Sequence, residues 1–158
     1  MKIDEYVDKV EKRIYSKGKL LSTWYSSLRQ ARLGEAKADL LVRGNMAVKG
    51  FLLSRIGRVA VPAWETLAVV FSPRGGENPS VQQLEKMVAS TEQYMSKNSI
   101  KWSWLAYVSE KGFDTVTIDF VRNRLKKEIG IMLIDLSSKS FVCNNVKVNQ
   151  YGKRVFKL

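Results

Sequence analysis

The 158-residue sequence contains no histidine and a single cysteine, Cys143. These absences exclude zinc fingers, histidine-dependent metal sites, catalytic triads that need histidine, and an internal disulfide. No apolar run approaches the roughly 20 residues that span a bilayer, and the N-terminus lacks the pattern of a signal peptide. We therefore expect a cytoplasmic protein with no membrane partner, whose chemistry, if any, uses carboxylates, lysines or hydroxyls.

The composition is that of a folded domain, since 45% of the residues are hydrophobic and 27% are charged. At this length one domain is expected over residues 1–158. Within it, residues 1–19 are predicted to form a peripheral helix, and residues 141–158 a short hairpin or a basic tail.

Positive charge is in clear excess, with 27 Lys and Arg against 15 Asp and Glu, and a net charge of +12. Most of the excess lies in residues 1–37 and 99–158, whereas residues 79–98 are neutral overall. Such a field attracts polyanions, so nucleic acid is the favoured partner, DNA ahead of RNA. The alternative is a charged surface that serves only solubility. An anionic membrane surface is less favoured because the basic residues are not gathered on one amphipathic helix.

The spacing of apolar residues changes along the chain. Helical spacing predicts helices over residues 3–17 and 20–33, the second ended by Gly34. From Ala38 the segments become rich in Val, Leu and Phe, which favours a meander of antiparallel strands with turns at Gly44-Asn45 and Ile56-Gly57. On propensity alone, residues 35–54 could instead form a helix. The predicted strands of this meander cover residues 38–43, 46–55, 58–61 and 66–72.

The second half alternates strands and helices. Either Asn78, followed by Pro79, or Ser80 is predicted to cap a helix. Residues 100–108 are predicted to form a strand with Trp102 and Trp104 in the core, and Asp114 to cap a helix that Gly130 ends. Residues 131–136 are a continuous apolar run, typical of a strand covered on both faces. The predicted fold is therefore mixed α/β: a single mixed β-sheet flanked by helices, with an N-terminal helical segment.

Over roughly residues 20–136 this order of elements resembles the restriction-endonuclease-like fold. That family's motif, PD-(D/E)XK, puts one acid at a strand start and an acid-x-Lys pair on the next strand. Residues 67–76, Leu-Ala-Val-Val-Phe-Ser-Pro-Arg-Gly-Gly, followed by a helix and by residues 102–108, are similar to its central strand, crossover helix and next strand. Asp39 corresponds to the first acid but lacks the preceding proline, and no Glu-x-Lys lies on a predicted strand.

The resemblance implies a metal-dependent DNA nuclease with a degenerate motif. Some members of the family carry an acid on the neighbouring helix, and Glu85 beside Lys86 is the candidate here. Asp39, Glu65 and Glu85 would then hold Mg²⁺ or Mn²⁺, while Lys86 or Lys49 stabilises developing charge. Each acid also has a simpler interpretation, as a strand-edge, turn or solvated helix residue. The lysine-rich composition is also similar to that of small proteins of thermophilic archaea and their viruses, which would place a viral protein in the host cytoplasm.

Basic residues interleaved with apolar ones on the meander are the candidate phosphate contacts, because some must project from the face opposite the core. We expect these contacts, with two from the later helix, to be Arg43, Lys49, Arg55, Arg58, Arg74, Lys126 and Lys127. Three hypotheses remain open: a nuclease, a non-catalytic DNA- or RNA-binding or assembly protein on the same scaffold, and a protein-binding module whose charge serves solubility. A homodimer is compatible with each.

Overall fold

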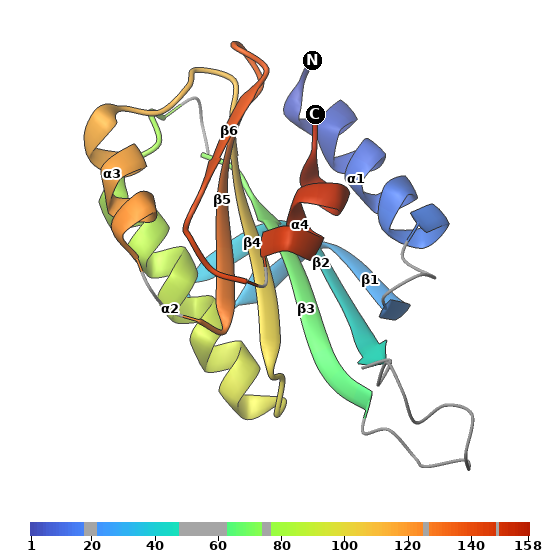
Figure 1. The fold of residues 1–158 in the computed structure, drawn as a ribbon. Helices are drawn as coiled ribbons and strands as arrows, with labels where there is room; N and C mark the ends of the chain where they lie inside the picture. Colours follow the sequence, from blue (N-terminus) through green and yellow to red (C-terminus); the bar gives the residue numbers. More distant parts are fainter. Residues whose placement is uncertain (18–21, 48–62, 74–76, 125–126, 148) are drawn as a thin grey trace.

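A six-stranded sheet with helices on both faces forms the centre of the molecule in the computed structural model (Figure 1). The structure describes residues 1–17, 22–47, 63–73, 77–124, 127–147 and 149–158. Its strands are β1 (Ser22–Leu33), β2 (Ala36–Ala47), β3 (Ala63–Phe71), β4 (Trp102–Ser109), β5 (Ile129–Asp135) and β6 (Ser140–Cys143). The helices of the described residues are α1 (Ile3–Lys17), α2 (Val81–Lys97), α3 (Thr115–Asn123) and α4 (Asn149–Phe156).

The strands lie in the sheet in the order in which they occur in the chain. β1, β2 and β3 form an antiparallel meander. β3, β4 and β5 are parallel and are joined by the crossover helices α2 and α3, and β6 returns antiparallel to β5. The mixed α/β architecture predicted from the sequence is therefore confirmed.

Each face of the sheet has its own hydrophobic core, because successive strand residues point to opposite faces. Val70 and Trp104 belong to the core under α1 and α4, whereas Val69 and Tyr107 belong to the core under α2 and α3. In Figure 1 the two pairs of helices lie on opposite sides of the sheet. The strands β3, β4 and β5 are covered on both faces, which explains their continuous apolar sequences.

The helix predicted over residues 20–33 is wrong, since residues 22–33 form the edge strand β1. The apolar residues do not alternate strictly, because the strand changes the face that it turns to each side of the sheet. Arg29 contacts α1, whereas Ala31 and Leu33, two and four residues later, pack on the α2 side. The change occurs at Gln30, whose φ is 52°. Pairing with β2 supplies the main-chain hydrogen bonds that a helix would otherwise make internally.

One predicted turn and one predicted helix end also differ, whereas the predicted turn at Ile56-Gly57 lies outside the described residues. β2 continues through Gly44 and Asn45, and the chain reverses instead at Gly34, whose φ of 55° suits glycine. The predicted strands over residues 46–55 and 58–61 fall largely outside the described residues. α3 ends at Asn123, while Gly130 lies inside β5. A loop therefore separates helix and strand where the sequence pattern predicted a direct stop.

The last residues form β6 and the helix α4 instead of a hairpin or tail. α4 packs on the sheet through Gly152 and Phe156, and the latter is 1% exposed. Of the two predicted caps of α2, Ser80 and not Asn78 is the N-cap, and the predicted cap Asp114 of α3 is confirmed. Their side chains accept hydrogen bonds from the amides of Gln83 and Thr117. None of the described helices is long and apolar enough to cross a membrane.

Candidate functional site

The sheet register places Asp39 and Glu65 far apart. Leu40 pairs with Val70, so Asp39 lies beside the end of β3, whereas Glu65 pairs with Asn45 near the start of that strand. Six positions of β2 separate Asp39 from Asn45, which is about 20 Å at roughly 3.3 Å per residue. Carboxylates that share a two-metal site must reach ions about 4 Å apart. Asp39 and Glu65 therefore do not share a metal site.

Glu85 lies on the exposed side of α2. The helix packs on the sheet through other residues, among them Leu84 and Val88, which are buried. The structure thus does not assemble Asp39, Glu65 and Glu85 into one site for Mg²⁺ or Mn²⁺. Among the described residues no group of three or more Asp, Glu, Cys or His side chains is placed to hold a metal ion.

Glu65 binds a neighbouring cation. Nη2 of Arg43 lies 2.6 Å from Oε2 of Glu65, and Nη1 of Arg43 donates to Oδ1 of Asn98 at 3.4 Å. Asn98 caps the C-terminal end of α2, so this cluster ties β2, β3 and α2 together. The charge of Arg43, predicted to contact phosphate, is already compensated here.

Asp39 lies at the other end of β2 and is half-buried. Its Oδ1 accepts a hydrogen bond of 3.4 Å from Nε2 of Gln30, the residue at which β1 changes face. The strand residues beside it are Val70 and Phe71, which are fully buried and apolar. An acid-x-Lys pair is absent from this position.

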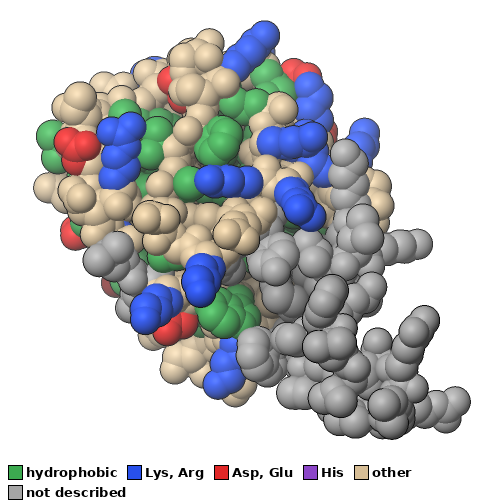
Figure 2. Space-filling view, viewed as in Figure 1, with side chains coloured by type: hydrophobic (Ala, Val, Ile, Leu, Met, Phe, Trp, Pro, Cys, Tyr) green, Lys and Arg blue, Asp and Glu red, His purple; other side chains and the backbone are tan. Residues whose placement is uncertain are grey.

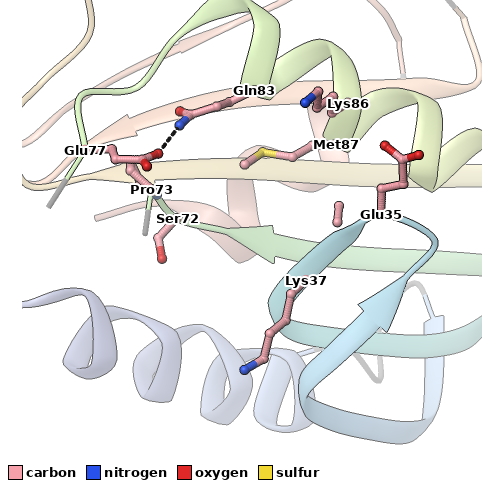
Figure 3. Close-up of a pocket in the computed structure, with 9 residues that line it drawn as sticks. Glu35, Lys37, Ser72, Pro73, Glu77, Gln83, Lys86 and Met87 are labelled. Carbon is pink, nitrogen blue, oxygen red and sulfur yellow. Dashed lines mark hydrogen bonds between the residues drawn. The ribbon is translucent and has the colours of Figure 1, made fainter. Parts of the chain in front are cut away.

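A shallow pocket of about 260 Å³ lies between the β1–β2 turn, the end of β3 and the first turns of α2 (Figure 3). Two carboxylates, Glu35 and Glu77, and two ammonium groups, Lys37 and Lys86, line it. The exposed Lys86 is the one predicted site residue found here. Sequence reasoning missed the pocket because the turn after Leu33 was expected to be a helix end.

A hydrogen-bonded chain runs from the core into the wall of this pocket. The hydroxyl of Tyr107 donates to Oε1 of Gln83 at 2.7 Å, and Nε2 of Gln83 donates to Oε2 of Glu77 at 2.5 Å. Burial raises the pKa of Tyr107 to about 12, so the phenol remains a donor at physiological pH. The chain holds Gln83 and Glu77 in place; with balanced charges, the pocket offers no excess attraction for an anion.

Of the seven predicted phosphate contacts, Arg43 and Lys127 lie among the described residues. Lys127 is exposed, in the turn before β5. The other five candidates lie outside the described residues: Lys49, Arg55, Arg58, Arg74 and Lys126.

The C-terminal residues form a basic segment that sequence reasoning only touched upon. After Asp135 the chain contains no Asp or Glu, a signal that was readable in the sequence. Figure 2 shows the face that carries α4, with several Lys and Arg side chains over it and few acidic ones. The basic residues of this segment are all exposed: Lys139, Lys147, Lys153, Arg154 and Lys157.

Comparison of the chain with protein-family models, with curated proteins and with solved structures found no match.

Proposed function

We propose that this protein binds nucleic acid, DNA in preference to RNA, and does not cut it. The observation that carries the proposal is the net charge of +12, 27 basic against 15 acidic residues. Several of the acids are already engaged with cations of the same chain, among them Glu5, Asp8, Glu11 and Glu65. The remaining positive field favours a polyanion, and nucleic acid is the usual polyanion in a cell.

The order of elements supports a restriction-endonuclease-like scaffold. A helix, an antiparallel meander and a crossover helix leading to a parallel strand are present as α1, β1 to β3, α2 and β4. Asp39, near the start of β2, stands where that family has its first acid. On the neighbouring strand β3, Val69-Val70-Phe71 occupies the three positions of an acid-x-Lys pair. Because no acid and no lysine stand at these positions of β3, we expect binding of DNA without hydrolysis.

The test uses the purified protein with a short duplex DNA of random sequence and with the matching duplex RNA, in the presence of a chelator. We expect binding to both, tighter to DNA, with log affinity falling linearly with log salt between about 50 and 200 mM. Absence of salt-dependent binding to either duplex would overturn the proposal and leave a protein-binding module.

A second assay adds Mg²⁺ or Mn²⁺ in place of the chelator. We expect intact DNA after prolonged incubation. Metal-dependent cutting that Asp39→Asn abolishes and Glu85→Gln leaves unchanged would instead establish a nuclease centred on Asp39, with Glu85 as the matched exposed control.

A further inference from the structure

We infer that duplex DNA lies on the surface formed by Lys147, Lys153, Arg154 and Lys157, here called the α4 basic surface. This inference rests on the proposed function and names the part of the molecule that performs it. It differs from the expectation that the phosphate contacts lie on the β-meander.

The charges of the α4 basic surface are uncompensated within the described part of the chain. No acidic residue follows Asp135 in the sequence. None of the four cations forms an ion pair with a described residue. All four are exposed, so each ammonium or guanidinium group is available to a phosphate oxygen.

Several cations on other parts of the described surface form ion pairs with acids, unlike the four of the α4 basic surface. On α1, Lys9 binds Glu5, and Arg29 of β1 binds two further α1 acids. On the opposite face Arg122 and Arg124 lie 3.8 Å from Asp119 and Glu92, respectively. Among the described helices, α4 is therefore the one that carries cations and no acidic residue of its own.

Helix geometry places the α4 cations on one side. At 3.6 residues per turn successive residues are about 100° apart, so Lys153 and Arg154 of α4 span an arc of about 100°. Lys157 follows directly after the end of the helix. Gly152 and Phe156 point to the sheet and are buried. The cationic arc consequently faces away from the core, as a surface that contacts a phosphate backbone requires.

The end of α4 is anchored through its main chain, which fixes the position of the helix that carries these side chains. The hydroxyl of Tyr6 donates to the carbonyl of Phe156 at 2.6 Å. Arg13 donates through Nη1 to the carbonyl of Val155 at 2.9 Å and also to that of Lys157. These bonds satisfy carbonyls that the helix end leaves without partners. The backbone of a helix held in this way does not have to be ordered when the surface binds its partner.

The chemistry of α4 favours DNA over a lipid surface. A helix that lies in a membrane interface turns apolar side chains toward the bilayer, but Phe156 of α4 is buried against the protein. The described exposed side chains of α4 are Gln150, Lys153 and Arg154, which are polar or cationic. Such groups suit the phosphates of a duplex better than unpaired bases, which bind by stacking on aromatic rings.

The experiment compares two double variants of the full chain with equal loss of charge. One is Lys153→Gln with Arg154→Gln on α4; the control is Lys97→Gln with Arg122→Gln on α2 and α3, across the sheet. All four side chains are exposed, and thermal unfolding verifies that both variants are folded. For the α4 variant we expect at least tenfold weaker binding to duplex DNA, and a salt slope smaller by about 2, since each phosphate contact contributes roughly 0.9. The control should stay within about twofold of the wild type.

The possible outcomes separate the two proposals. Equal weakening by both double variants would overturn the α4 assignment while DNA binding itself stands. No binding by the wild type would overturn the proposed function. Tighter binding of the wild type to vesicles of phosphatidylserine and phosphatidylcholine than to DNA, lost in the α4 variant, would overturn the choice of nucleic acid as the occupant.

Discussion

At the scale of single residues, the buried Asn144 joins the C-terminal segment to the sheet. Its Oδ1 accepts hydrogen bonds from the amide of Ile131 at 2.8 Å and from Nδ2 of Asn149 at 2.7 Å. Its Nδ2 donates to the carbonyls of Ile129 at 3.1 Å and Arg124 at 3.3 Å. One side chain thus links the end of β6 to β5, the loop after α3, and the start of α4.

Replacing Asn144 with Ala should destabilise the protein by about 2 to 4 kcal/mol, because buried partners lose their hydrogen bonds. The adjacent Asn145 is exposed and provides the matched control, for which Asn145→Ala should cost less than about 0.5 kcal/mol. Urea unfolding of both variants measures the difference. Equal stabilities would show that the network around Asn144 contributes little.

The candidate metal ligands show what residue types alone can predict about a site. The acids Asp39, Glu65 and Glu85 are identifiable from the sequence, but their separation depends on the register of β2 with β3 and on the orientation of α2. Register is decided by which faces are buried, and a shift of one residue would exchange the faces. For that reason sequence reasoning could nominate these residues but not place them.

At the scale of secondary structure, local signals predicted α2 and α3 well and failed for β1 and α4. The N-caps Ser80 and Asp114 belong to the chain segment that they cap, so neighbouring residues suffice to predict them. β1 depends on pairing with β2, a long-range contact. α4 depends on docking, since short helices are marginal alone and gain their stability from packing.

The close approach of α4 to the sheet gives a prediction for this element. A Cβ at Gly152 would lie 2.5 Å from Cδ1 of Trp104 and 2.6 Å from Cε of Met132. We expect Gly152→Ala to lower the free energy of unfolding by about 1 to 3 kcal/mol, despite the higher helix propensity of Ala, because the core there is already full. The exposed Gln150 of the same helix serves as control.

The measurement is urea unfolding of Gly152→Ala beside Gln150→Ala. An unchanged midpoint for Gly152→Ala would mean that α4 can move away from Trp104 without loss of stability. Weaker DNA binding by the folded Gly152→Ala protein would further indicate that docking of α4 positions its cations.

At the scale of the whole molecule, carboxylates in distant parts of the fold have lowered pKa values. For Glu11, burial raises the pKa, but hydrogen bonds from Ser27 and Arg29 and the charge of Arg29 lower it by more. For Asp135, burial again raises the pKa, and hydrogen bonds from Ser137 and Ser138 more than offset this. Both groups therefore favour the folded state when they are ionised.

The sign of the pH dependence follows from these lowered values. A carboxylate whose pKa is lower in the folded state contributes stability above its unfolded pKa, near pH 4, and loses it as the pH falls further. Protonation also increases a net charge that is already +12, so repulsion adds to the loss. We expect the melting temperature to fall steeply below about pH 4.

Thermal unfolding between neutral and strongly acidic pH tests this, with Asp135→Asn as the comparison. The variant should have a lower melting temperature than the wild type near pH 7. This difference in melting temperature should become smaller at acidic pH, as Asp135 becomes protonated in the wild type. A difference that stays constant over the whole pH range would contradict the role assigned to ionised Asp135.

The amino-acid sequence alone determined the properties that depend on composition or on residues close together in the chain. These are the net charge, the lack of histidine chemistry, the N-caps, the parallel strands β3 to β5 and the mixed α/β class. Tertiary structure decided what depends on partners remote in the chain. It made residues 22–33 a strand, separated Asp39 from Glu65, and docked α4 with its cations outward. The physical reason is that hydrogen-bond partners, buried faces and register arise only when distant segments meet.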